Sequence, residues 1–169
     1  MKAAGVILAV AAALALQTTL NRFLVRETFA VDLVLVAVVY VALTAGPVTG
    51  MLAGTIAGLL QDALGSGIIG IGGLAKTVVG FLAGLIGTQF IVTNSFPRFL
   101  VFLGATALHA AVFIGLYTVL DLRHFGAPYT QVAGQALGNA FVGVIAFEVV
   151  ELLPGALERR RAQRGRLRR

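Results

Sequence analysis

The sequence predicts an all-α membrane protein with six transmembrane helices. Hydrophobic residues make up 59% of its 169 residues and charged residues only 12%, and the mean hydropathy is +0.96. A soluble domain is usually about a quarter charged. The apolar residues gather in segments separated by short polar or Gly/Pro breaks. Because a bilayer core of about 30 Å takes roughly 17 to 25 residues of helix, these segments are read as spans.

The breaks between the apolar segments define the six expected helices. The first segment ends in the polar residues Gln17, Thr18 and Thr19, and the second is short and ends at Gly46-Pro47. Proline cannot continue a helix without losing a hydrogen bond, so the second and third segments favour a hairpin of short spans over one long broken helix. A turn over residues 93–98 and a stop at Pro154-Gly155 are expected further on. The predicted spans cover residues 3–20, 31–45, 48–61, 68–92, 99–120 and 129–153.

The basic residues predict the orientation of these spans. Positively charged loops stay in the cytoplasm, and an even number of spans then places both the N and the C terminus there. Nine basic residues fall on the cytoplasmic side in this arrangement, namely Lys2, Arg98 and the seven arginines of the tail, and three fall outside, namely Arg22, Arg26 and Arg123. The chain therefore divides into a six-helix transmembrane domain, 1–158, and a basic cytoplasmic tail, 159–169.

The basic tail is expected to touch anionic lipid. Nucleic acid is not an expected partner, because the tail has no aromatic residue and no folded basic face accompanies it. The tail carries seven of the thirteen basic residues of the chain, at Arg159, Arg160, Arg161, Arg164, Arg166, Arg168 and Arg169.

A strip of glycines recurs at four-residue steps through the third span. Gly50, Gly54 and Gly58 follow Gly46, and a second series occurs at Gly80 and Gly84. In water each interior glycine would cost a helix about 1 kcal/mol against alanine. In a membrane the same spacing forms a flat face that another backbone can approach closely. We expect the strip to touch a neighbouring span or the helix of a partner protein.

Two ionisable residues lie in this glycine-rich region. Asp62 ends the third span, and Lys76 lies about two turns into the fourth. Asp62 either caps the next helix and accepts amides of the turn, or contacts a partner or ligand. Lys76 either extends its ammonium toward the interface, or pairs with Asp62, or lines a ligand cavity. Charges in the hydrocarbon are costly, so both residues are candidate site residues.

Further polar residues lie inside the fifth and sixth spans. His109 is in the middle of the fifth, and Gln131, Gln135 and Asn139 share one face of the sixth because they are spaced by four. Hydrogen bonding between helices is the simpler interpretation. A buried cavity or a proton relay is the alternative, although no carboxylate is expected at the depth of the histidine.

No catalytic constellation is present in the sequence. Only two histidines occur, and neither an HExxH motif nor a GxxxxGK[ST] phosphate loop is found. The absence of cysteine excludes disulfides and thiolate metal sites. No enzymatic activity, metal or cofactor is therefore expected. Glu148 and Glu151, at the inner end of the sixth span, are expected to pair with Lys2, Arg98 or the tail.

The motifs of the third and fourth spans resemble those of the rod-shape-determining MreD family. The resemblance rests on Gly46-Pro47, the glycine strip, the GLLQD motif ending at Asp62, and Gly73-Leu74-Ala75-Lys76. The LQTTL segment 16–20 and Asp32-Leu33 also fit, although Val31 stands where the family usually has proline. The resemblance implies a non-enzymatic subunit of the bacterial cell-wall elongation machinery in the inner membrane. The implied partners are the single-span protein MreC, the cytoskeletal MreB, and RodA with its transpeptidase.

The resemblance also leaves a second function class open. MreD proteins are similar in fold to the S components of energy-coupling-factor vitamin transporters, which implies an S-component-like bundle. The alternative function is therefore the substrate-binding subunit of a small-molecule transporter, with Lys76, Gln135 or Asn139 in reach of the ligand. The AxxxA spacing of Ala9 and Ala13, which S components use for docking, also occurs here.

Overall fold

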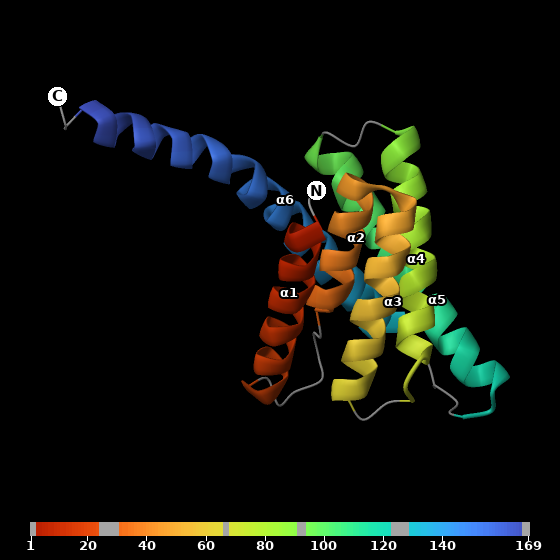
Figure 1. Ribbon diagram of the computed structural model, residues 1–169. Coiled ribbons are helices and arrows are strands. Elements are labelled where there is room, and N and C mark those ends of the chain that lie inside the picture. The colour runs from red at the N-terminus through yellow and green to blue at the C-terminus, as the bar shows by residue number, and fades with distance from the viewer. Residues whose placement is uncertain (1–2, 24–30, 66–67, 91–93, 123–128, 167–169) are drawn as a thin grey trace.

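The protein folds as a bundle of helices, shown as a computed structural model in Figure 1. The structure describes residues 3–23, 31–65, 68–90, 94–122 and 129–166. Every regular element within these residues is an α-helix, which confirms the predicted all-α fold. The helices in chain order are α1 (Ala3–Phe23), α2 (Leu33–Ala45), α3 (Pro47–Leu64), α4 (Ile71–Gln89), α5 (Ser95–Val119) and α6 (Tyr129–Arg166).

Consecutive helices run in opposite directions along the bundle (Figure 1). The start of α1, the turn between α2 and α3, and the departure of α6 consequently share one end, which we call the tail end. The α2–α3 turn depends on Gly46, whose φ of 88° lies in a region that L side chains rarely adopt. Pro47 then opens α3, where its missing N–H has no intrahelical partner to lose. The predicted break at Gly46-Pro47 is confirmed, with α2 and α3 as the two helices of a hairpin.

Helix α2 lies at the centre of the bundle. It contacts α1, α3, α4, α5 and α6, and a helix that is apolar on all sides is typically buried in this way. Val34, Val38 and Val41 pack toward α1 and α3, whereas Leu35 and Val39 pack toward α4, α5 and α6. With 13 residues, α2 is about 20 Å long, well short of the bilayer core of about 30 Å.

Three helices within the described residues are long and apolar enough to cross a membrane, over Ile71–Gln89, Ser95–Val119 and Tyr129–Leu152. Two shorter apolar helices accompany them, over Ala4–Leu20 and Leu33–Ala45. Large apolar side chains such as Ile56 on α3 and Phe141 on α6 are more than half exposed. Such surfaces suit lipid, where exposed apolar groups carry no cost. The chain is a membrane protein built on several apolar helices.

Two predicted boundaries are wrong. Residues 95–98, predicted as part of a turn, form the first turn of α5. Pro97 is tolerated there because the first turn has no hydrogen bond for proline to remove. Helix α6 does not stop at Pro154-Gly155 and continues to Arg166. The alanine, leucine, glutamate and arginine residues that follow are strong helix formers, which sustain the helix beyond the proline.

Candidate functional site

The N-terminus of α2 is the point on which the buried polar residues converge. The first backbone N–H groups of a helix have no intrahelical partner. Asp32 is the N-cap residue, and its Oδ1 accepts from the N–H of Leu35 at 2.9 Å. The N–H of Asp32 itself donates to Oδ1 of Asn139 at 2.9 Å, and the N–H of Leu33 donates to Oε1 of Gln17 at 2.8 Å. Side chains of α1 and α6 therefore complete the cap of α2.

An ion pair crosses this site. The ammonium of Lys76 lies 2.8 Å from Oδ2 of Asp32, and both side chains are buried, with 4% and 7% of their surface exposed. The same ammonium lies 3.2 Å from Nε2 of His109. Because an ammonium can only donate, Nε2 accepts and the imidazole is neutral. Two opposite charges and a neutral acceptor leave the site without net charge, which lowers the cost of burying it.

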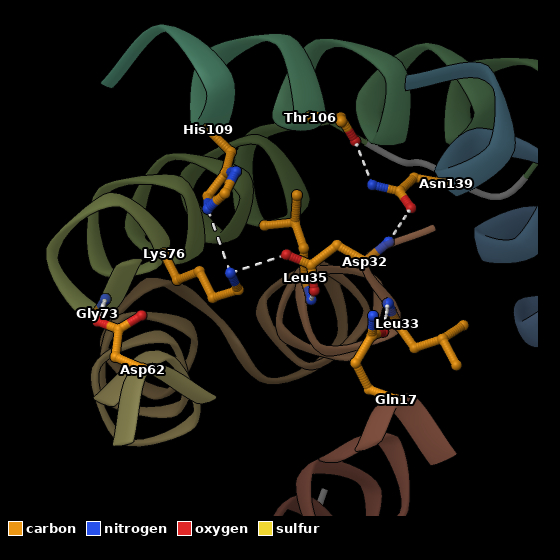
Figure 2. Close-up of polar contacts among 10 residues, drawn as sticks. All are labelled: Gln17, Asp32, Leu33, Leu35, Asp62, Gly73, Lys76, Thr106, His109 and Asn139. Atoms are coloured by element: carbon orange, nitrogen blue, oxygen red, sulfur yellow. Dashed lines mark hydrogen bonds and ion pairs between the residues drawn. The ribbon is translucent and has the colours of Figure 1, made fainter. Parts of the chain in front are cut away.

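A hydrogen-bonded branch links the ion pair to α5 and α6. Asn139 is fully buried, and its Nδ2 donates to Oγ1 of Thr106 at 3.1 Å. Thr106 in turn donates to the carbonyl of Phe102 at 2.9 Å. We name the residues of this network the charged centre, and Figure 2 shows that they point toward one another from α1, α2, α4, α5 and α6. Its members are Gln17, Asp32, Lys76, Thr106, His109 and Asn139.

Lys76 does not pair with Asp62, so that alternative is wrong. Oδ2 of Asp62 accepts instead from the N–H of Gly70 at 2.9 Å and from the N–H of Gly73 at 3.1 Å. Asp62 thus caps the start of α4, as the first of its two interpretations predicted, and its negative charge suits the positive end of that helix. Figure 2 shows Asp62 beside Gly73, while Lys76 points to Asp32.

The glycine strip packs on α4. A Cβ atom added to Gly50 would lie 2.5 Å from the carbonyl oxygen of Gly80, and one added to Gly58 would lie 2.5 Å from Cα of Gly73. One added to Gly54 would overlap the carbonyl of Lys76. The strip therefore touches the backbone of a neighbouring span of the same chain. Because Gly54 lies on the Lys76 carbonyl, this close approach also fixes the position of Lys76.

The polar stripe of α6 contributes one residue to the charged centre. Asn139 belongs to it, whereas Gln131 is exposed and Gln135 is half-buried. Eight residues of helix separate Gln131 from Asn139, which is about 12 Å along the axis. Residues on one face of a helix can therefore lie at very different depths in the bundle. The structure brings His109, Lys76 and Asn139 together and leaves the two glutamines outside the network.

Sequence reasoning missed three members of the charged centre, namely Gln17, Asp32 and Thr106. Asp32 carried a usable signal, because an aspartate directly before an apolar run is typical of a helix N-cap. It is also the carboxylate at the depth of His109 that the sequence did not lead us to expect. Gln17 and Thr106 had no comparable signal, since a single polar residue in an apolar helix does not reveal which helix it faces.

A second ionic cluster lies at the tail end. Arg98 is buried, contacts Glu151 with both guanidinium nitrogens and lies 3.7 Å from Glu148. Ser95 donates to the same Glu148 at 2.8 Å, and the guanidinium of Arg98 stacks 4.5 Å over the ring of Phe147. The expected pairing of these glutamates with Arg98 is confirmed. We name these five residues the Arg98 cluster.

Comparison with known families decides the identity of the chain. The family model described as rod shape-determining protein MreD matches residues 2–153. The chain belongs to the MreD family. No curated protein and no solved structure matches it significantly. As a member of the MreD family, the protein is a non-enzymatic, multi-pass protein of the inner membrane with a role in rod-shape determination.

The MreD-family match includes the whole charged centre and the Arg98 cluster. Within the charged centre the two charges are paired, and the side-chain amides and the hydroxyl are hydrogen-bonded. Within the described residues, no three His, Cys, Asp or Glu side chains gather in a way that would hold a metal ion.

Proposed function

We propose that this chain is a non-enzymatic scaffold of the cell-wall elongation machinery that binds an MreC-like single-span membrane protein. MreB, and RodA with its transpeptidase, are the further partners that we assign to it. Membership of the MreD family over residues 2–153 carries this proposal. The charged centre supports it, because its buried groups bond to one another and brace five helices into a rigid body.

The finer architecture belongs to the same proposal. We propose that all six helices cross the membrane in an S-component-like bundle with both termini in the cytoplasm. Helix α2 is shorter than the bilayer core, and side chains of α1 and α6 accept from the N–H groups at its buried start, so that this end does not need to reach the membrane surface. The nine-to-three distribution of basic residues supports the orientation.

The transporter alternative finds less support in the contacts. It placed Lys76, Gln135 or Asn139 within reach of a small ligand, and the first and last of these have internal partners. Lys76 is bound by Asp32 and His109, and Asn139 is bound by the backbone of Asp32 and by Thr106. A ligand would have to displace these internal partners and leave a buried carboxylate unpaired, which is costly.

Co-purification and calorimetry distinguish the two functions. The protein is co-expressed with an MreC-like protein, extracted in detergent and captured through a tag, and an unrelated single-span protein serves as the control. We expect retention of the MreC-like protein alone. The same purified protein is titrated with a panel of vitamins, for which we expect no heat of binding. Tight binding of a vitamin without retention of the MreC-like protein would overturn the proposal.

A further inference from the structure

Helix α6 continues beyond the transmembrane bundle. Glu148 and Glu151 of α6 pair with Arg98 of α5, and the helix then continues to Arg166. Figure 1 shows this last part running sideways from the tail end, away from the other helices rather than parallel to them. We name residues 154–166 the C-terminal extension.

A proline lies at the start of the C-terminal extension. Pro154 has no backbone N–H, and its ring crowds the carbonyl four residues earlier, so a helix bends where proline interrupts it. Gly155 follows directly and adds no side chain that would resist the bend. The Arg98 cluster fixes α6 within its last turn before the proline. The Arg98 cluster therefore fixes the part of α6 from which the C-terminal extension leaves the bundle.

The composition of the C-terminal extension differs from that of the rest of α6. It contains five arginines and a single acidic residue, Glu158. It is too short and too charged to cross a bilayer, which requires roughly 17 to 25 mostly apolar residues. The chain has no aromatic residue after Phe147, so the extension lacks the stacking groups with which single-stranded nucleic acids are bound.

We propose that the C-terminal extension is an interfacial helix that binds anionic phospholipid headgroups at the tail end of the bundle, with Arg98 as its positioning residue. A helix that leaves a membrane-embedded bundle sideways lies along the headgroup layer. Guanidinium groups bind phosphate through charge-assisted, often bidentate hydrogen bonds, and juxtamembrane basic segments are attracted to anionic lipids. This inference rests on the membrane location of the bundle, and it holds whichever proteins the bundle binds.

Spin labelling tests the lipid contact, because the chain has no cysteine of its own. Gln163→Cys places a label in the C-terminal extension, and Gln89→Cys places a control label at an exposed position at the end of α4. Both variants are placed in nanodiscs of phosphatidylcholine, with or without phosphatidylglycerol. We expect the label at position 163 to lose mobility and to become several-fold less accessible to a water-soluble relaxation agent only where phosphatidylglycerol is present. The control label should not respond to the lipid.

Two further measurements make this test specific for charge. Salt at about 1 M, where the screening length falls to about 3 Å, should restore mobility at position 163. Replacing Arg159, Arg160 and Arg161 by glutamine should remove the response to phosphatidylglycerol. The proposal is overturned if the label behaves identically in both lipids. It is equally overturned if the label is immobilised only on addition of an acidic protein.

A distance measurement tests the positioning role of Arg98. Labels at positions 89 and 163 of one molecule should give a narrow distance distribution in phosphatidylglycerol nanodiscs. Arg98→Gln should broaden that distribution at least two-fold while the extension stays bound to lipid. Glu151→Gln tests the same contact from its other side. The side chain of Glu151 is 54% exposed, so this replacement does not open a buried site. It should also broaden the distance distribution. An unchanged distribution in both variants would eliminate the role of Arg98.

Discussion

At the scale of single residues, the most costly groups in this molecule are the charges that it buries. Lys76 and Asp32 are nearly inaccessible, yet each has specific partners: the ammonium has a carboxylate and an imidazole, and the carboxylate has the ammonium and the N–H of Leu35. A buried pair of this kind adds little net stability against an apolar pair. We infer that its value is specificity, because the pair forms only when α4 is packed with Lys76 facing the start of α2.

Removing one charge of the pair should be more harmful than removing both. Lys76→Met leaves the carboxylate of Asp32 buried without its cation, and we expect a loss of about 3–5 kcal/mol in unfolding free energy. Asp32→Asn combined with Lys76→Met keeps an acceptor for the N–H of Leu35 and removes both charges. Unfolding in detergent should show the double variant to be more stable than Lys76→Met alone. Additive losses would contradict the pairing.

Asn139 is the second residue whose replacement is informative. Asn139→Leu removes the acceptor for the N–H of Asp32 and leaves that group buried and unsatisfied, at a cost of about 1–3 kcal/mol. Gln135→Leu, one turn earlier on α6, is the matched control, because Gln135 is half-buried and outside the charged centre. Thermal unfolding of the two variants should rank Asn139→Leu well below Gln135→Leu. Equal midpoints would show that the cap of α2 does not need Asn139.

At the scale of elements, the closest contact in the bundle is between α3 and α4. The two backbones meet through Gly50, Gly54 and Gly58 on one side and Gly73 and Gly80 on the other. Small residues allow such an approach in a membrane, where dispersion contacts rather than water drive helices together. The same approach places Lys76 on the far side of α4, facing α2 and α5. Packing between two helices therefore sets the geometry of the charged centre.

Two glycine replacements distinguish the effect of helix packing on stability from the effect of helix propensity. Gly54→Ala introduces a Cβ that would overlap the carbonyl of Lys76, so we expect a loss of about 1–3 kcal/mol as α3 and α4 move apart. Gly104→Ala on α5 is the control, since a Cβ there meets no atom within 4 Å, and it should be neutral or stabilising by up to about 1 kcal/mol. Chemical unfolding of both variants is the measurement. A stable Gly54→Ala protein would mean that α3 and α4 are less tightly packed.

At the scale of the whole molecule, the bundle is asymmetric from end to end. The tail end holds the Arg98 cluster, the aromatic packing of Tyr40 and Phe102 on Phe147, and the departure of the C-terminal extension. The charged centre lies around the start of α2, and Asp62 caps α4 at the end opposite the tail. The basic C-terminal extension and Arg98 thus lie at the same end of the bundle, which is the end that we propose to face the cytoplasm.

Reporter fusions test the orientation of the molecule. A fluorescent protein fused after Arg169 should fluoresce, and alkaline phosphatase at the same position should be inactive, because that end is expected in the cytoplasm. Alkaline phosphatase inserted between α5 and α6 should be active, because α5 ends and α6 begins at the opposite end of the bundle. An active phosphatase after Arg169 would contradict the arrangement with six spans and both ends inside.

The sequence by itself determined the class of the protein and the local character of its helices. Hydropathy and Gly/Pro breaks predicted an all-α membrane fold, because apolar segments in a bilayer have to satisfy their backbone groups internally. Glycine spacing predicted a close helix contact, and the approach of the α4 backbone to Gly54 meets that expectation. Both signals are local, so they can be read along the chain. The continuation of α6 past Pro154 was missed, since proline weakens a helix without always ending it.

Only the tertiary structure decided which buried polar groups meet. Lys76 is nearer to Asp62 in the chain than to Asp32, yet it pairs with Asp32. Asp62 turns to the amides at the start of α4, and the close packing of α3 on α4 directs Lys76 toward α2. Asn139 and Gln17 reach the same point from opposite ends of the chain. Pairings of this kind depend on helix rotation and depth, which follow from the packing of all the helices at once.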